Sequence, residues 1–183
     1  GFALYIRPTL ICTEGFLGVR PSHEYLFFVI LSPVSAYYQG SLTPIRIWVE
    51  EKYVRAAPGG LGATKAGANY AASLRAALEA KKKGYAQVLW LDPTHQYVEE
   101  VGTMNVFFVI NGEVVTPALN GSILAGGVRE SAITMLRDWG YKVTERRISI
   151  HEVAEAIFAG TLTEAFGTGT AAVISTGSRL SVI

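Results

Sequence analysis

Short apolar runs alternate with longer amphipathic segments along the chain. Runs rich in β-branched and aromatic residues predict strands, whereas alanine-rich or amphipathic segments with helical spacing predict helices. Strands are expected over residues 2–12, 24–31, 43–49, 87–91, 97–100, 106–110, 141–148 and 164–166. Helices are expected over residues 66–83, 127–139 and 150–158. This order of elements predicts an α/β fold (α+β mixed) in which helices flank a mixed sheet.

Residues that favour turns and helix ends support these boundaries. Gly84 follows the first expected helix, at the position where a left-handed residue commonly ends one. Asn111-Gly112 closes a strand-like run and predicts a tight hairpin turn. Ser149 precedes the third helix and Glu152 lies three residues later, which is the spacing of a capping box.

The same pattern carries expectations about burial. The apolar strand over residues 24–31 is continuous enough to be central in a sheet, and Cys12 is expected to be a buried strand residue. Glu99 and Glu100 are adjacent, so on an extended strand one should face the interior and the other the solvent. A buried carboxylate is costly unless it is paired, so the inward glutamate needs a partner.

Composition describes a chain that can bury a sizeable core. Of 183 residues, 50% are hydrophobic and 17% are charged, which excludes a disordered chain and fits one domain, or one domain with a fragment of another. The net charge is +1 and the charged residues are scattered, so no nucleic-acid partner is expected.

Compartment and metal binding can also be judged from composition. The longest apolar run, residues 26–31, is far shorter than a bilayer span, and no leader pattern opens the chain, so no membrane association is expected. The lone cysteine excludes an internal disulfide and suits a reducing compartment, so we expect a cytoplasmic protein. His23, His95 and His151 lack metal-ligand spacing; no metal site is expected, and all three should lie at the surface.

A glycine-rich loop around Lys65 is the main candidate for chemistry, with the sequence PGGLGATKAGANYAASL over residues 58–74. A lysine among small, apolar neighbours is expected to be partly desolvated, which favours the neutral, nucleophilic amine. A phosphate-binding P-loop needs glycine before the lysine and a hydroxyl after it, whereas Thr64 and Ala66 occupy these positions. The better interpretation is a Schiff-base lysine that holds pyridoxal phosphate; nucleotide binding and an ordinary lysine at a helix start are the alternatives.

That interpretation requires further groups elsewhere in the chain, namely an acid for the pyridinium nitrogen and donors for the phosphate. One of the two adjacent glutamates is a candidate for the acid. The Gly126-Gly127 pair at a helix start presents N–H groups that suit an anion. Thr168 and Thr170 add hydroxyls in a glycine-containing segment. Tyr70 lies a little over one helical turn after the lysine, so its phenol can reach the same site.

Four segments, in this order and spacing, resemble the branched-chain amino acid aminotransferases, which are pyridoxal-phosphate enzymes of fold type IV. The segments are GGLGATKAGANYAASL, QVLWLDPTHQYVEEVGTMNVFFV, SILAGGVRESAI and FGTGTAAVI, and the resemblance starts at LYIRP and covers nearly the whole chain. It implies the large C-terminal domain of these enzymes, a mixed sheet or pseudobarrel flanked by helices. Residues 41–183 would form this pyridoxal-phosphate-binding domain, truncated, and residues 1–40 the end of the N-terminal region and the interdomain connection.

The resemblance implies a role for each matching residue. Lys65 matches the Schiff-base lysine, which also carries the proton between the substrate α-carbon and the cofactor. Glu100 matches the acid at the ring nitrogen, and Tyr70 matches the tyrosine at the phenolic oxygen. The residues that match the phosphate site are Gly127, Val128 and Thr170. Those that match the substrate pocket are Tyr5, Arg7, Tyr37, Thr103, Thr170 and Ala171.

The implied activity is transfer of the amino group of leucine, isoleucine or valine to 2-oxoglutarate, with glutamate as product, in a homodimer. The alternatives are an inactive or partial pyridoxal-phosphate-binding fragment of such an enzyme, a D-amino acid aminotransferase, or an aminodeoxychorismate lyase. Departures from the family pattern are Ala68 in place of a glycine, and Ala172 and Ser175 at the positions of the mammalian CxxC. An N-terminal domain with a phosphate-binding arginine, and residues after position 183, are expected in the complete protein.

Overall fold

The computed structural model describes residues 3–34, 45–170, 173–177 and 179–181, and the description of side chains ends at residue 170. The chain divides into two compact units, Gly1–Gln39 and Gly40–Ile183, which are described separately below. Among the described residues, no helix is both long and apolar enough to cross a membrane.

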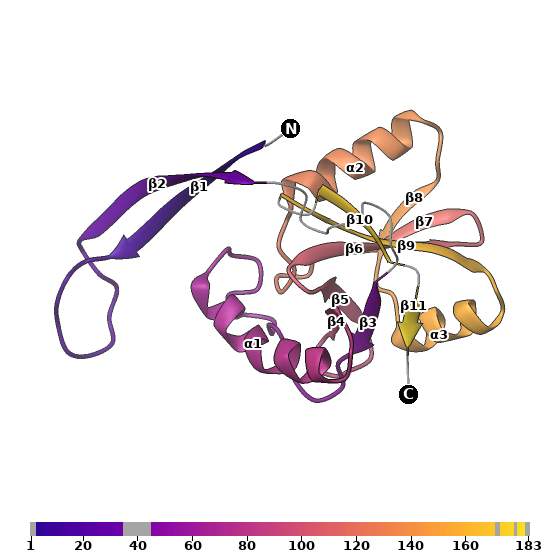
Figure 1. Ribbon diagram of the computed structural model, residues 1–183, viewed down its shortest axis with the longest axis horizontal. Helices are drawn as coiled ribbons and strands as arrows, with labels where there is room; N and C mark the ends of the chain where they lie inside the picture. Colours follow the sequence, from indigo (N-terminus) through magenta and orange to yellow (C-terminus); the bar gives the residue numbers. More distant parts are fainter. Residues whose placement is uncertain (1–2, 35–44, 171–172, 178, 182–183) are drawn as a thin grey trace. The chain divides into compact units, whose positions relative to one another are not determined.

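In the first unit, two strands form an antiparallel hairpin (Figure 1). β1 (Ala3–Cys12) pairs along its whole length with β2 (Tyr25–Val34). Both predicted strands are therefore present, but the prediction of a central β2 is wrong, because β1 is its one strand partner within the described residues and most of its side chains are exposed. Cys12 is likewise exposed rather than buried, since a two-stranded hairpin has no second layer of its own to cover it.

The second unit contains the helices and the remaining described strands (Figure 1). The helices are α1 (Gly67–Lys82), α2 (Gly127–Asp138) and α3 (Ile150–Phe158). The strands are β3 (Arg46–Val49), β4 (Gln87–Leu91), β5 (Val98–Val101), β6 (Met104–Ile110), β7 (Glu113–Pro117), β8 (Val143–Arg146), β9 (Leu162–Gly169), β10 (Val173–Gly177) and β11 (Arg179–Ser181). Each predicted helix is present, with ends within one residue of the prediction.

The strands of this unit form one mixed sheet. Its order is β10-β9-β6-β5-β4-β3-β11, with β7 beside β6 and β8 beside β7. β6 is antiparallel to β9 on one side; on the other side its start pairs with β5 and its end with β7. Parallel pairing joins β3 to β4 and to β11, and β7 to β8. The mixed sheet with helices confirms the predicted fold class.

The helices cover both faces of the sheet. α1 packs on β4 through a cluster that contains Ala76 and Trp90, and α2 packs on β6 through Ile133 and Phe107. α3 lies on the opposite face, where the largest apolar cluster includes Val153. Alternate residues of β4 and β6 point to these two faces, because successive side chains in a strand point in opposite directions. The face covered by α1 and α2 carries the polar residues described below.

Local sequence signals place the ends of several elements. Gly84, after α1, has a φ of +81°, a left-handed conformation that ends the helix without steric cost. Asn111 and Gly112 have φ values of +51° and +78° and form the two-residue turn between β6 and β7. Ser149 caps α3, since its hydroxyl accepts the Glu152 N–H at 3.0 Å. The Glu152 carboxylate, however, binds Arg146 instead of completing the predicted capping box, because a cation is the stronger partner.

Several strand lengths differ from the prediction, and the largest differences are in β9 and β8. β9 is longer than residues 164–166, because it follows β6 for most of its length and its glycines pair in the ladder. β8 is shorter than residues 141–148, because its parallel partner β7 ends at Pro117. His23 and His151 are exposed as expected, whereas His95 is half-buried with its Nδ1 enclosed.

Candidate active site

A row of polar and aromatic side chains crosses four strands on the face covered by α1 and α2. Trp90 of β4 lies opposite Glu100 of β5. Glu100 in turn lies opposite Asn105 of β6, which lies opposite Thr168 of β9. Directly opposite residues of antiparallel strands point to the same face, so these side chains form one continuous floor. With neighbouring strands ~4.8 Å apart, Glu100 and Thr168 are separated by about 10 Å.

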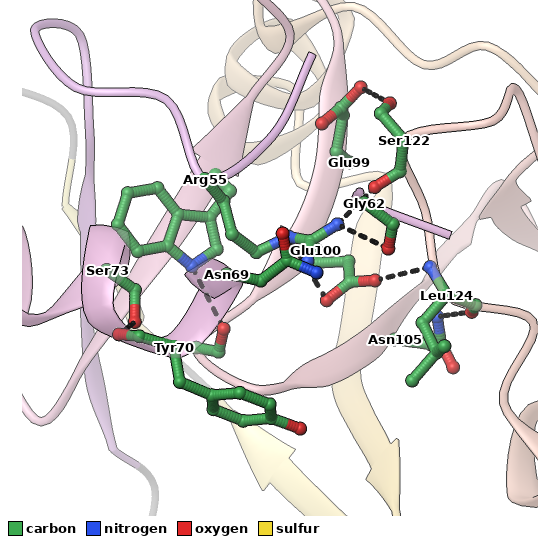
Figure 2. Close-up of polar contacts among 12 residues, drawn as sticks. Arg55, Gly62, Asn69, Tyr70, Ser73, Glu99, Glu100, Asn105, Ser122 and Leu124 are labelled. Atoms are coloured by element: carbon green, nitrogen blue, oxygen red, sulfur yellow. Dashed lines mark hydrogen bonds and ion pairs between the residues drawn. The ribbon is translucent and has the colours of Figure 1, made fainter. Parts of the chain in front are cut away.

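Glu100 is the buried acid of this floor, with 4% of its surface exposed. Its Oε2 lies 3.4 Å from Nε of the buried Arg55, and its Oε1 accepts the backbone N–H of Leu124 at 2.9 Å (Figure 2). Burial raises the pKa of Glu100 to about 7, although Arg55, the Leu124 N–H and the Lys65 ammonium all act to lower it. The carboxyl can therefore hold or release a proton near neutral pH.

The neighbouring Glu99 is also buried, with 1% of its surface exposed, so the expectation that one of the two glutamates faces solvent is wrong. The alternation of side chains is as expected, but both faces of β5 are covered. The Ser122 hydroxyl donates to Glu99 Oε1 (Figure 2). Asn120 Nδ2 donates to the same oxygen at 3.1 Å. The loop before α2 therefore supplies the cover over Glu99.

The loop that carries Lys65 is fastened to the helix that follows it. The Asn69 side chain in α1 donates to the backbone carbonyls of Leu61 and Thr64, at 2.7 and 2.8 Å. Lys65 itself is exposed, contrary to the expected desolvation, because the small residues around it provide little to cover its side chain. It nevertheless lies close enough to Glu100 for its positive charge to act on that carboxyl.

The lysine loop, α1 and the floor together form a pocket that opens to solvent. Its lining includes four predicted residues, Lys65, Tyr70, Glu100 and Thr103, together with Arg55 and Asn69 among others. The Trp90 indole N–H donates to the Gly102 carbonyl at 2.9 Å and so fixes the backbone beside Thr103. Tyr70 is 40% exposed and contributes to the rim.

The other end of the floor has the character of an anion site. Thr168 is 1% exposed, and its hydroxyl has no hydrogen-bond partner among the described residues. Its neighbour Asn105 packs against Gly126, the residue that precedes α2, so closely that a Cβ on Gly126 would clash with the amide oxygen. α2 begins with no side-chain cap, which leaves the N–H groups of its first turn available.

The predicted site residues are thus partly assembled by the second unit. Lys65, Tyr70, Glu100 and Thr103 share the pocket. Gly127 and Val128 form the start of α2, and Thr170 lies exposed in the turn after β9. Tyr5 and Arg7 are neighbours on β1 of the first unit, where Arg7 Nη2 donates to the Tyr5 hydroxyl at 3.3 Å. Tyr37 and Ala171 lie outside the described residues.

Sequence reasoning missed the residues that support these groups. Arg55, Asn69, Asn105 and Ser122 each bind a backbone carbonyl or a carboxylate of the site. Arg55 could have been noticed as a single cation in an alanine- and glycine-rich segment, which predicts a buried charge with a specific partner. The others carry no signal in one sequence, because asparagine and serine are common in ordinary loops.

This arrangement combines an amine and a buried acid around one cavity with a set of anion-binding donors at the other end of the same floor. Such a set can bind a molecule that is cationic at one end and anionic at the other. The lysine can attack a carbonyl carbon of that molecule or transfer a proton at a neighbouring atom.

Comparisons with known proteins find aminotransferases that are similar to this chain. Residues 1–175 match the family model of amino-transferase class IV. Among similar curated proteins, branched-chain-amino-acid transaminase 1 of Bacillus subtilis (strain 168) is 57% identical over 184 aligned positions, which cover all of this chain and 52% of that protein. The chain therefore spans about half the length of this relative.

Solved structures of similar fold include aminotransferases with bound ligands. The branched-chain aminotransferase from the thermophilic archaeon Thermoproteus uzoniensis, determined with norvaline, superposes with a TM-score of 0.84 at 27% identity, over 97% of this chain and 57% of that one. An aminotransferase from Brucella abortus bound to the cofactor PLP gives a TM-score of 0.80 at 28% identity, over 97% and 60%.

Proposed function

The chain belongs to the amino-transferase class IV family, and on that basis we propose that the complete protein is a branched-chain amino acid aminotransferase. It transfers the amino group of leucine, isoleucine or valine to 2-oxoglutarate and so produces glutamate. The observation that carries the proposal is the pocket lined by both Lys65 and Glu100, in which the pKa of the buried glutamate is raised by burial to about 7.

The residues of the pocket fit pyridoxal phosphate, the cofactor of this family. Glu100 offers a proton-binding carboxyl that suits a basic ring nitrogen. At the far end of the floor, the buried Thr168 hydroxyl lacks a partner among the described residues and the first turn of α2 is uncapped, as expected where a phosphate binds. The acid and the anion site lie about 10 Å apart along the floor, which suits a small ring with a phosphate arm.

When bound, pyridoxal phosphate supplies an electron sink that stabilises negative charge on the α-carbon of the substrate. In the proposal, Lys65 Nζ would hold the cofactor as a Schiff base and would carry a proton from and to the substrate α-carbon. Glu100 would keep the ring nitrogen protonated, which would strengthen the sink. Tyr70 would orient the ring by bonding to the phenolic oxygen of the cofactor.

The remaining predicted residues are assigned as proposals to the two ends of the site. Gly127, Val128 and Thr170 bind the phosphate. Thr103 faces the substrate, and the hydrogen bond from Trp90 to the Gly102 carbonyl fixes the backbone beside it. We assign Tyr5, Arg7, Tyr37 and Ala171 to the substrate pocket as well, residues 41–183 to the cofactor-binding domain and residues 1–40 to the preceding region. The complete protein is proposed to act as a homodimer.

Incubation of the complete protein with pyridoxal phosphate, leucine and 2-oxoglutarate tests the proposal, with glutamate as the measured product. We expect turnover in the wild type and its loss, by at least about 10³-fold, in Lys65→Ala, because the nucleophile and proton carrier is removed. Lys81→Ala, which removes an exposed lysine near the end of α1, is the matched control and should retain full activity. Absence of transfer from leucine, isoleucine and valine alike would overturn the proposal.

A second candidate function is that this chain by itself binds the cofactor without turnover. The exposure of Lys65 and Tyr70 favours it, because within this chain the pocket is open to water on the lysine side. The isolated chain would then show a cofactor absorbance band that is lost in Lys65→Ala, with no glutamate formed. Glutamate formation by the isolated chain excludes this candidate.

A further inference from the structure

Glu99 takes no part in the chemistry proposed above, yet it is one of the most deeply buried side chains of the molecule. Its Oε1 accepts hydrogen bonds from Asn120 and Ser122, and its Oε2 has no partner within the described residues. Both donors are neutral. A carboxylate buried among neutral donors is costly for folding, so its presence requires a physical reason.

Ser122 connects Glu99 to the environment of Glu100. The Ser122 hydroxyl donates to Glu99, while its backbone carbonyl accepts from Arg55 Nη2 (Figure 2). Arg55 Nε in turn lies 3.4 Å from Glu100 Oε2. Two residues further along the same segment, the Leu124 N–H donates to Glu100 Oε1 at 2.9 Å. The segment of residues 120–124 thus contacts both carboxyl groups, although they point to opposite sides of β5.

The charges of the three buried side chains do not cancel. Arg55 contributes one positive charge, and Glu99 and Glu100, when ionised, contribute one negative charge each. Without Glu99, the guanidinium would neutralise Glu100, and the buried cluster would have no net charge with which to attract a cation. Because buried charges are weakly screened, the additional carboxylate changes the local potential substantially.

The charges around Glu100 shift its pKa in opposite directions. Burial is the main cause that raises the pKa of Glu100, and the negative charge of Glu99 raises it further. The groups that face Glu100 from other segments act in the opposite direction, namely Arg55, the Leu124 N–H and the Lys65 ammonium. Tyr70 of α1 lines the same pocket.

We infer that Glu99 is a positioning residue for Glu100. Its charge offsets that of Arg55, and its hydrogen bonds to Asn120 and Ser122 fix the segment that holds the Glu100 carboxyl. The functional consequence rests on the proposed function, because the net negative charge favours a protonated ring nitrogen beside Glu100.

Carboxyl ¹³C NMR titration of the complete protein without cofactor tests the inference directly. Glu99→Gln removes the charge but keeps the shape and most hydrogen bonds, and Glu99→Met removes both. In either variant the Glu100 pKa should fall by roughly half a unit or more, because a nearby negative charge has been removed. Glu155→Gln makes the same chemical change on the exposed side of α3 and should leave the Glu100 titration unchanged. A folded Glu99→Gln protein in which Glu100 titrates as in the wild type overturns the inference.

The same variants separate this inference from the proposed function. With pyridoxal phosphate bound, the pH midpoint of the cofactor absorbance change should move to lower pH in Glu99→Gln, because the ring nitrogen loses a stabilising negative charge. A shifted Glu100 titration in a protein that takes up no cofactor would support the inference and refute the proposed function. Cofactor binding together with an unshifted Glu100 titration in the variants would support the proposed function and refute the inference.

Discussion

Asn69 fixes the lysine loop to the helix that follows it. Its amide group donates to the carbonyls of Leu61 and Thr64, so the backbone immediately before Lys65 is tied to the first turns of α1. Because Lys65 is exposed and has no hydrogen bond of its own within the described residues, its position depends largely on this backbone. The direction of the amine is therefore controlled by a neighbour that does no chemistry.

Replacement of that amide tests this dependence. Asn69→Asp keeps the size of the side chain but removes both donors and places a charge against two carbonyl oxygens. We expect kcat/KM for transamination to fall about 10- to 100-fold, because a small displacement of a reacting group lowers the reaction rate strongly. Steady-state kinetics of the complete protein would measure it. Asn69→Ala should behave similarly, and unchanged kinetics in both variants would show that the loop holds its own shape.

Among individual residues, the sequence predicted the candidate reactive groups better than the residues that hold them in place. Lys65 was found from its small, apolar neighbours, whereas the choice of Glu100 over Glu99 came from the family resemblance; the structure places Lys65 and Glu100 in one pocket. Arg55 was missed, because its partner lies on another element and one sequence does not show that contact. The desolvation of Lys65 was predicted wrongly, since small neighbours indicate room around a side chain and not what fills it.

The lysine loop is in close contact with the segment before α2. A Cβ on Gly62 would clash with the Ser122 backbone oxygen, so the two segments could not keep their present contact. The Gly62 and Ser122 carbonyls both accept from the Arg55 guanidinium. Glycine at this position is thus required for the packing of one loop on another.

Gly62→Ala should consequently lower the free energy of unfolding by roughly 1–3 kcal/mol, as is typical of overpacking. Gly67→Ala is the matched control: a Cβ there has no neighbour within 4 Å, and its place in the first turn of α1 tolerates alanine, so stability should be unchanged or slightly higher. Urea denaturation followed by circular dichroism gives both values. Equal stability of the two variants would mean that the loop is free to move apart from the segment.

The cap of α3 allows a second test at this scale. Ser149→Ala removes the acceptor of the Glu152 N–H and should cost about 1 kcal/mol in the free energy of unfolding. Ser131→Ala, within α2, removes a hydroxyl that bonds the Gly127 carbonyl of the same helix, and should be nearly neutral. A loss in the second variant as large as in the first would contradict the capping role.

Elements with local signals were predicted well and elements set by pairing were not. The three helices follow from periodicity and end residues that act within a few positions of each other. β9, by contrast, extends through glycines that favour no strand, because β6 supplies the hydrogen bonds. The order of strands, with β6 joined to three others, depends on contacts far apart in sequence and was not predicted.

For the molecule as a whole, the raised pKa of Glu100 implies a dependence of stability on pH. The folded state binds this proton more tightly than the unfolded state does, since burial raises the pKa of Glu100 from an ordinary 4.5 to about 7. The stability contributed by the protonated carboxyl is therefore complete below about pH 4.5 and is lost as pH rises through 7. Carboxyls with lowered pKa, such as Glu145 and Glu152, lose their contributions only at more acidic pH.

The free energy of unfolding of the cofactor-free protein should therefore fall by up to ~3 kcal/mol between about pH 5 and pH 8. Glu100→Gln cannot ionise and should show a much flatter profile over this range. Urea titrations at several pH values would measure both curves. Parallel curves for the two proteins would mean that Glu100 titrates in the folded state much as it does in water.

Glu100, the acid of the pocket, lies in a strand of the sheet, whereas Lys65, its amine, lies in a loop. Backbone amides of Glu100 and Asn105 lie inside the strand ladder, so in deuterated water they should be among the last to exchange, while the turn around Lys65 should exchange early. On mild heating, the sheet that forms the pocket floor would stay folded after the loop had lost the conformation that orients Lys65. Catalysis would then fade at temperatures where spectroscopy still reports an intact protein.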